Sequence, residues 1–251
     1  MIYKYFIKFK RKRGYFVDIL MKETIVQQRI LMLGISLGGE CMKKNAKEAI
    51  AEAAISLFHS NGYSGTSIRD IANLAKVNTA TIAYHFNNKP GLLEYCFMHF
   101  FEQYMSRIEE AYLSIDRGAK ECLRRIVADL LHYQCENNRL ASFVYREMSM
   151  DSQVVREIMS TYSLKEKYYF QKIFERGFEW HEFRPHSIPY LIIQLKSLLM
   201  MPFMNMQYIR EVLYIFTNEP FFEQKYLKDI YLWIDKTLCL DEPLTKGAVN
   251  K

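Results

Sequence analysis

The chain has 251 residues, of which half are hydrophobic and 15% aromatic, so it can form one or two domains with a sizeable core. Its formal net charge of +6 is concentrated at one end, because residues 1–41 contain eight basic and three acidic side chains. The rest of the chain is almost neutral, and overall basicity therefore does not argue for nucleic-acid binding. Five widely spaced cysteines without a C-x-x-C pair argue against a disulfide framework and fit a reducing cytoplasm.

Residues 1–41 show no helix caps, no coherent apolar face and no convincing cleavage site that would indicate a signal peptide. The segment Gly38-Gly39-Glu40 can be encoded as GGA-GGA-GAA, a ribosome-binding sequence, with a short spacer before Met42. We therefore expect translation to begin at Met42 and residues 1–41 to be a mis-annotated upstream extension. A disordered basic arm that grips DNA is the alternative.

The first predicted helix spans Lys44–Asn61, and Gly62 stands at its C-terminal capping position. Its apolar residues recur at helical spacing and share one face. They are Ala46, Ile50, Ala53, Ala54, Leu57 and Phe58. Together with the two short helices that follow, this helix predicts a three-helix unit.

Two short helices, each with a capping residue at its start, follow one tight turn apart. Ser67 stands three residues before Asp70, as in a capping box. Asn78 can cap the second helix, in which Ile82 and Phe86 lie four residues apart and anchor it to its neighbours. Such a pair of capped helices is the build of a helix-turn-helix.

The second short helix has a polar face opposite its apolar residues. Thr81, Tyr84 and His85 follow a spacing of three to four, and Asn78 and Thr79 lie in the exposed first turn. Hydroxyl groups, an imidazole and helix-terminal N–H groups suit phosphate oxygens and base edges. The pattern therefore predicts that this helix reads double-stranded DNA.

At these residues the chain resembles the TetR family of bacterial regulators. The positions that carry the resemblance are Val77, Thr81, Ile82, Tyr84, His85, Phe86, Lys89 and Leu92. The resemblance implies phosphate contacts by Thr81, Tyr84, His85 and Lys89, base-facing positions at Asn78, Thr79 and Ala80, and a base or phosphate contact by Arg69, with Ser67 completing the set. Ala83 departs from the pattern, because an aromatic residue is usual there, so specificity leans on Arg69 and Asn78.

The remaining elements are also helical in pattern, which predicts an all-α fold. Pro90 opens a long helix, from about Gly91 to Leu113, that connects the DNA-binding unit to the body. We expect a DNA-binding domain in residues 42–102, an all-helical dimerisation and regulatory domain in residues 103–240, and a tail in residues 241–251. The later helices are predicted at Lys120–Asn137, Leu140–Met150, Val154–Ile173 with a continuation to Gly177, Ile188–Met201 and Glu223–Leu240.

The predicted helix Ile188–Met201 is apolar nearly all round, and Pro202 is expected to end it. At roughly fourteen residues it is shorter than the about 20 needed to cross a bilayer, so no membrane partner is expected. It is expected to pack both on its own domain and on a second copy of the chain. The family resemblance implies a homodimer with a two-fold four-helix interface that also uses Glu223–Leu240.

No nucleotide-binding, serine-hydrolase or zinc-protease motif occurs, and the six histidines are scattered. We therefore expect no enzyme, no cofactor and no metal site. The many methionines and aromatic residues could line an effector pocket but fit a plain core better, so any small-molecule effector is unknown. Arg146 beside Glu147 could form a buried ion pair, a partner contact or a solvated face, and we favour the solvated face.

Four segments of the body are similar to a subgroup of that family, the forespore-capture DNA-binding regulators of spore-forming bacteria. They are residues 143–147, 156–162, 165–168 and 194–202. The resemblance implies a nucleoid-associated homodimer on near-palindromic chromosomal motifs that influences chromosome capture and division-ring placement during sporulation, with a division-machinery protein as a further partner. The alternative is a ligand-responsive TetR-type transcriptional repressor.

Overall fold

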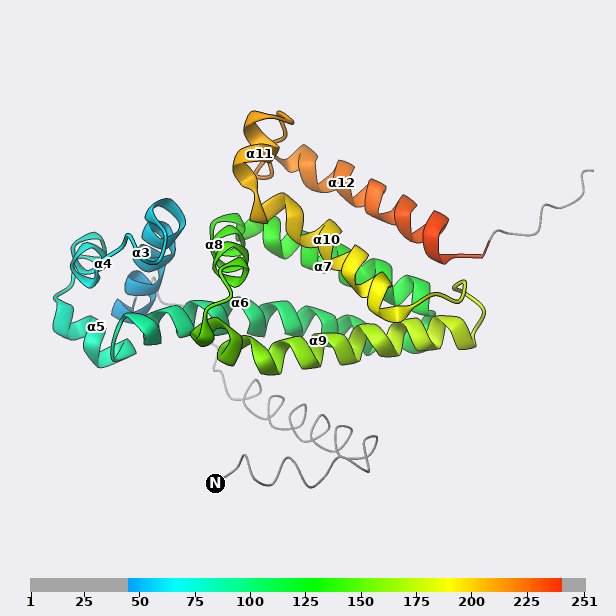
Figure 1. Cartoon of the computed structure of the whole chain (residues 1–251), viewed down its shortest axis with the longest axis horizontal. Helices are drawn as coiled ribbons and strands as arrows, with labels where there is room; N and C mark the ends of the chain where they lie inside the picture. The colour runs from blue at the N-terminus through cyan, green and yellow to red at the C-terminus, as the bar shows by residue number, and fades with distance from the viewer. Residues whose placement is uncertain (1–44, 241–251) are drawn as a thin grey trace, which may run out of the picture. The chain divides into compact units, whose positions relative to one another are not determined.

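The computed structural model describes residues 45–240, and these residues form an all-α structure, as predicted (Figure 1). Within them, β-structure is limited to an isolated antiparallel bridge between Phe183 and Cys239. The predictions made for residues 1–41 and for the tail at 241–251 lie outside the described part of the chain.

Three short helices pack on one another and on the start of a long fourth helix. They are α3 (Ala46–Asn61), α4 (Ile68–Ala75) and α5 (Thr79–Phe86), followed by α6 (Lys89–Tyr112). Their shared core consists of Ile50, Ala54, Phe58, Ile71, Ile82, Phe86 and Leu92, all nearly inaccessible to solvent. We call α3, α4 and α5 the DNA-binding unit. The boundary expected at residues 102 and 103 falls inside α6, which is continuous.

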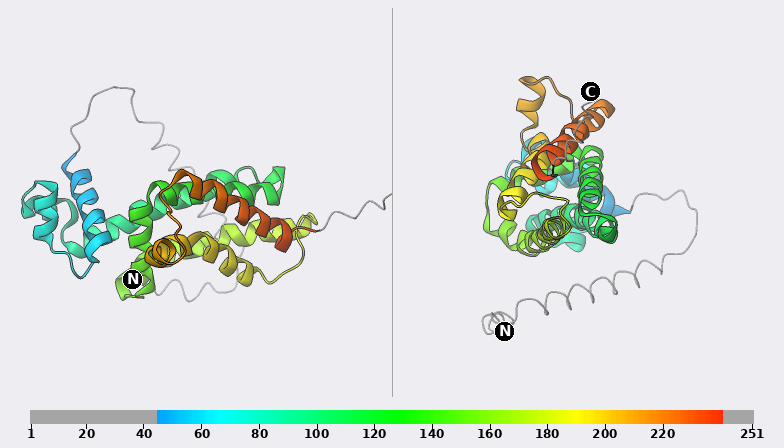
Figure 2. Two further views of the ribbon diagram at one scale, coloured as in Figure 1. Left: turned by 90° about the horizontal axis from the view of Figure 1, so that it is seen from above. Right: turned by 90° about the vertical axis from the view of Figure 1, so that its right-hand side faces the viewer.

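The other helices form the body around the C-terminal part of α6, which packs on α7 and α9 (Figures 1 and 2). They are η2 (Ile115–Arg117), α7 (Ala119–Glu136), α8 (Asn138–Ser149), α9 (Gln153–Glu179), α10 (Ile188–Met204), α11 (Met206–Glu211), α12 (Pro220–Trp233) and the π-helical turn η3 (Ile234–Leu238). Helix α10 packs on α8, and α12 packs on α7.

Aromatic rings fill the centre of the body. The fully buried ring of Phe100 on α6 lies 5.3 Å from the ring of Tyr133 on α7 and 5.6 Å from the ring of Tyr145 on α8. Each tyrosine hydroxyl has an acceptor, since Tyr133 donates to the Phe100 carbonyl at 3.1 Å and Tyr145 donates to Gln134 at 2.7 Å. Burial of these apolar rings is the main stabilising contribution to the body.

A charged side chain is also buried between three helices of the body. Glu166 on α9 is only 6% exposed, and it accepts a hydrogen bond of 2.9 Å from the Tyr104 hydroxyl on α6. Lys196 on α10 forms an ion pair with the other oxygen of the same carboxylate. Burial, and next the Glu166 charge, raise the pKa of Tyr104 well above its usual value. The carboxylate therefore ties α6, α9 and α10 together.

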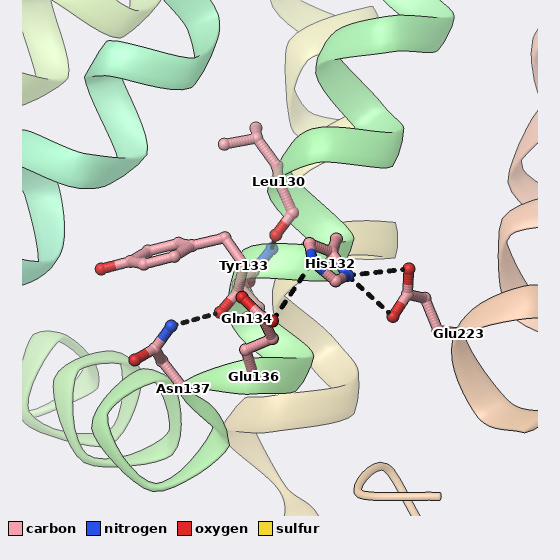
Figure 3. A network of polar contacts seen from close by, with 7 residues as sticks. All are labelled: Leu130, His132, Tyr133, Gln134, Glu136, Asn137 and Glu223. Atoms are coloured by element: carbon pink, nitrogen blue, oxygen red, sulfur yellow. Dashed lines mark hydrogen bonds and ion pairs between the residues drawn. The ribbon is translucent and has the colours of Figure 1, made fainter. Parts of the chain in front are cut away.

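Polar contacts also join α12 to α7. In Figure 3, His132 of α7 faces Glu223 of α12, with Nδ1 3.2 Å from both carboxylate oxygens, and its Nε2 lies 3.3 Å from Glu136 on its own helix. Just beyond the other end of α12, Asp235 of η3 pairs with Arg124 at 2.5 Å and with Lys120 at 3.0 Å. Helix α12 is thus anchored to α7 near both of its ends.

Helix α10 corrects the expectation that Pro202 ends the helix, because the helix continues to Met204. A proline inside a helix has no N–H to donate, and it leaves the carbonyl four residues earlier without its helical partner. That carbonyl belongs to Leu198, and it accepts a hydrogen bond of 2.8 Å from the Tyr226 hydroxyl on α12. The tertiary contact replaces the missing helical bond, which sequence periodicity could not indicate.

Two further expectations are corrected, and one short helix was missed. The last predicted helix does not run to Leu240, because the α-helix ends at Trp233 and continues as a π-helical turn. The six-residue helix α11 was not predicted. Arg146, expected on a solvated face, is half-buried and donates hydrogen bonds to α3. A short helix and a contact over 87 residues of sequence leave little periodic signal.

The four cysteines in the described residues are free thiols. Burial raises the pKa of the Cys96 and Cys122 thiols to about 12, and it also raises the pKa of Cys135 to about 12. A thiol reacts as the thiolate, so these three side chains are poor nucleophiles at neutral pH. Cys96 and Cys122 are buried and act as small apolar side chains of the core.

Candidate nucleic-acid interface

Helix α4 starts at the predicted capping box. The Asp70 N–H donates to Ser67 Oγ at 3.1 Å, and the Ser67 N–H donates back to Asp70 Oδ2 at 2.9 Å. The Ser67 hydroxyl also donates to that carboxylate at 2.6 Å, which lowers the pKa of Asp70. Ser67 is exposed, but its hydroxyl is engaged in holding the start of α4.

The turn between α4 and α5 is short and closed by backbone bonds. Lys76 adopts a left-handed conformation with φ of 55°, and the Val77 N–H donates to the Ala72 carbonyl at 3.0 Å. Asn78 then caps α5, since its Oδ1 accepts from the Thr81 N–H at 2.7 Å and from the Thr81 hydroxyl at 2.9 Å. The predicted cap is confirmed. The side-chain NH₂ group of Asn78 is left available to donate to another acceptor.

The solvent-facing side of this helix pair carries most of the predicted DNA-binding residues. Arg69 of α4 is exposed, and so are Thr79 and Ala80 in the first turn of α5. Tyr84 is 83% exposed, so its ring contributes little to packing and is free to contact a partner. Ala83 is exposed beside it. The pair therefore presents a guanidinium, hydroxyl groups and the free N–H groups of a helix N-terminus on its outer side.

His85 and Lys89 are held more tightly. The half-buried His85 ring lies 5.0 Å from the Tyr84 ring and 6.2 Å from the Phe86 ring. The Lys89 ammonium lies 4.3 Å from the centre of the Tyr63 ring, a cation–π contact that orients its side chain. Sequence reasoning did not include Tyr63 in the site. The sequence shows that Tyr63 lies in a turn between Gly62 and Gly65. Its contact with Lys89, however, depends on how the turn after α3 packs.

Two hollows lie outside this surface. One, of about 360 Å³, lies between α3, the end of α4 and α8, and its lining includes Ser56, Lys76 and Arg139. The other, of about 310 Å³, lies beside α12 and is lined by Tyr214, Phe216, Phe221, Lys225, Tyr226 and neighbouring residues. Ligand sites are usually concave and mostly enclosed, and both of these hollows are open to solvent.

Within residues 45–240, no three acidic, histidine or cysteine side chains are grouped so that they could hold a metal ion. Among the helices of the same residues, none combines the length and the apolar character that a bilayer-spanning segment requires.

Comparison with known proteins places the DNA-binding unit in a known family. The family model described as "Bacterial regulatory proteins, tetR family" matches residues 50–96. The "Probable HTH-type transcriptional regulator YttP" of Bacillus subtilis is 46% identical over 194 residues, which cover 77% of this chain and 94% of that protein.

Two further proteins share less of the sequence. The biofilm operon icaADBC negative transcriptional regulator IcaR of Staphylococcus epidermidis is 32% identical over 88 residues, covering 34% of this chain and 46% of that protein. The crystal structure of the TetR family regulator PfmR from Thermus thermophilus superposes with a TM-score of 0.64 at 20% identity, covering 77% of this chain and 99% of that chain. The protein is a member of the TetR family of helix-turn-helix transcriptional regulators.

Proposed function

We propose that the protein binds near-palindromic chromosomal sites as a homodimer through the outer side of α4 and α5. The observation that carries this proposal is the helix-turn-helix whose caps are all formed and whose outer side exposes Arg69, Thr79 and Tyr84. Exposed polar side chains beside a free helix N-terminus match the groups that contact DNA.

The residues divide into two roles. Thr81, Tyr84, His85 and Lys89 are assigned to phosphate oxygens, and this group supplies affinity without sequence information. Arg69 is assigned to a base edge, where a guanidinium pairs in bidentate fashion with guanine. Asn78, Thr79 and Ala80 occupy the first turn of α5 and face the bases, with the Asn78 NH₂ group as the donor.

The dimer is supported by apolar residues that the body leaves exposed. On α10, Tyr190 is 67% and Ile193 is 60% exposed, although the opposite face of the same helix is buried. Leu232 on α12 is also exposed. Large apolar side chains that a folded domain leaves exposed on neighbouring positions of a helix favour an interface, and a two-fold dimer would present two recognition helices to two half-sites.

Two regulatory roles are compatible with this DNA-binding head. The first is a positional factor that acts in chromosome capture and division-ring placement through a division-machinery protein, and the resemblance of the body segments favours it. The second is a transcriptional repressor that releases DNA when it binds a small molecule. The partial similarity to IcaR, which is a negative transcriptional regulator, supports the second role.

Mapping the chromosomal sites occupied by the native protein in cells separates the two roles. Sites in a few promoters would support the repressor, and a search for its ligand would follow. Palindromes spread around the replication origin and mostly away from promoters would support the positional factor. The control is the Tyr84→Ala variant, which we expect to lose occupancy at all sites. Occupancy that this variant retains in full would contradict the proposed interface.

A further inference from the structure

The C-terminal end of α3 points its last carbonyl groups at the body. The last four of them, from Phe58 to Asn61, have no helical N–H to accept from within α3, and they carry the negative end of the helix dipole. The Phe58 carbonyl accepts from the Gly62 N–H at 3.1 Å, and the Leu57 carbonyl, one residue earlier, accepts an additional bond of 3.2 Å from the Thr66 hydroxyl. The DNA-binding unit therefore supplies part of this cap from its own residues.

The rest of the cap comes from α8 in the body. Arg146 Nη2 donates to the Phe58 carbonyl at 2.6 Å, and its Nη1 donates to the His59 carbonyl at 3.1 Å. A planar guanidinium that spans two carbonyls holds both a distance and a direction, unlike a single point charge. Its side chain is half-buried, where such charge-assisted bonds are stronger than in water.

A ring contact reinforces this cap. The Phe58 ring stacks on the Phe143 ring of α8 at 5.1 Å with an interplanar angle of 24°. Phe143 lies one helical turn before Arg146, so that α8 holds the same end of α3 through an apolar and a charged contact. Two contacts of different kinds restrict the helix against both sliding and rotation.

The same contacts reach a predicted DNA-binding side chain. The Phe58 ring lies 5.4 Å from the Tyr63 ring, and that ring carries the Lys89 ammonium. Glu147 lies close enough to contribute, after burial, to the raised pKa of Tyr63. Because α3 also packs on α4 and α5, a rotation of α3 against α8 would carry the recognition helix with it.

We propose that Arg146 is a positioning residue that fixes the DNA-binding unit on the body and thereby sets the distance between the two recognition helices of the dimer. This inference rests on the homodimer of the proposed function. Half-site spacing is a geometric property of such a dimer, so the residue that holds each unit at its angle also determines which spacing binds best.

The chain offers a matched control for the loss of charge. Arg139 lies on the same helix and is exposed. Burial lowers the pKa of His59 most, and the charges of Arg146 and Arg139 lower it further, so both arginines act on the same neighbourhood. The described residues show no hydrogen bond from Arg139 to α3. Arg139→Gln therefore removes one positive charge from the same neighbourhood and leaves the guanidinium cap in place.

The first test uses the full-length protein without DNA. Hydrogen–deuterium exchange is measured for peptides covering residues 57–66 in the wild type, in Arg146→Gln and in Arg139→Gln. Loss of two charge-assisted bonds should speed exchange of these amides on the order of tenfold in Arg146→Gln only, with peptides of α9 unchanged. Equal exchange in all three proteins would show that Arg146 does not hold the end of α3, and it would overturn the proposal.

The second test uses duplexes that carry a palindrome selected in vitro with the wild-type protein, with base pairs added to or removed from the centre. We expect Arg146→Gln to bind the best spacing about tenfold more weakly and to lose much of the preference between spacings. Arg146→Lys, which keeps the charge but not the two-point geometry, should lie between. Arg139→Gln should keep the wild-type spacing profile.

A uniform loss of affinity at every spacing would show that Arg146 merely supports stability, and it would overturn the positioning role. A wild-type protein that shows no spacing preference would instead overturn the proposed dimeric mode of binding. The exchange experiment would then still decide whether Arg146 holds the end of α3, because it requires neither DNA nor a second copy of the chain.

Discussion

Helices α4 and α10 find hydrogen-bond partners for their unpaired backbone groups in different ways. α4 is eight residues long, and its first turn is closed by Ser67 and Asp70, which lie within that turn. α10 is 17 residues long and contains Pro202, and the carbonyl released by this proline is bonded by Tyr226 from α12. The first solution uses neighbours in sequence, and the second uses a side chain 28 residues away.

This difference separates the roles of the two regions. Because α4 and α5 are closed by local caps, their outer side chains remain free to contact DNA and contribute little to packing. In the body, by contrast, the Tyr226 hydroxyl that bonds the free carbonyl of α10 also joins α10 to α12. Substitutions on the outer side of the DNA-binding unit should therefore change binding without stability, and substitutions inside the body should do the reverse.

The largest effect is expected for Phe100→Ala in the body. Phe100 is fully buried among Phe101, Tyr104, Tyr133 and Tyr145, and its truncation leaves a cavity that these rings cannot fill. We expect a loss of about 3–5 kcal/mol in the free energy of unfolding, measured by urea titration. A loss below about 1 kcal/mol would show that the aromatic cluster repacks.

Two substitutions on the outer side of the DNA-binding unit should leave the unfolding midpoint unchanged. Tyr84→Ala is expected to weaken binding to cognate and scrambled DNA alike, on the order of tenfold, because it removes the proposed phosphate contact. Arg69→Ala should cost about 1–3 kcal/mol on the cognate site and relax base preference at one position in each half-site. Equal losses on cognate and scrambled DNA for Arg69→Ala would contradict the base contact proposed for it.

Tyr226→Phe tests the long-range hydrogen bond that compensates for Pro202 in α10. Removal of the hydroxyl leaves the Leu198 carbonyl without the partner that replaced the missing helical bond. We expect a loss of about 1–3 kcal/mol in the free energy of unfolding. Tyr231→Phe on the same helix is the control, because that hydroxyl donates to the Arg124 carbonyl through a longer bond of 3.3 Å. Equal losses in both variants would mean that the proline site has no special need of the hydroxyl.

Ser67→Ala tests the local cap of α4 and should have a smaller effect. Loss of an N-cap hydroxyl costs about 1 kcal/mol in typical helices, and Ser67→Gly should recover part of it. The exposed Ser64, which forms no part of this cap, provides the control as Ser64→Ala. Hydrogen exchange of the α4 amides measures the change, and protection that stays at the wild-type level would contradict the role of the capping box.

The smallest effect is expected from His59, at the junction of the two regions. Burial, and next the charges of Arg146 and Arg139, lower the pKa of His59 below 6.5. The unfolded chain then takes up a proton before the folded one does, so stability falls as the pH is lowered through 6.5 and levels off below the folded pKa. The difference in unfolding free energy between pH 7.5 and pH 5.5 should shrink in His59→Gln. An unchanged difference would assign the pH dependence to other groups.

The sequence predicted the DNA-binding unit far better than the body. The caps at Ser67 and Asn78 involve residues three apart, and such patterns can be read directly along the chain. Thr79, Ala80 and Tyr84 of the predicted site also face solvent, because helical periodicity separates them from Ile82 and Phe86. Tyr63 escaped prediction, because its contact with Lys89 joins the turn after α3 to the start of α6.

The sequence by itself determined the all-α class, the helix-turn-helix, and the face that this motif turns to solvent, because helix periodicity and capping act over a few residues. Only the tertiary structure decided that α10 continues through Pro202, that Glu166 is enclosed by Tyr104 and Lys196, and that Arg146 caps α3. Each of these features pairs groups that lie far apart in sequence. Such pairings form only after the helices have packed, when a buried polar group must find a partner that local patterns do not specify.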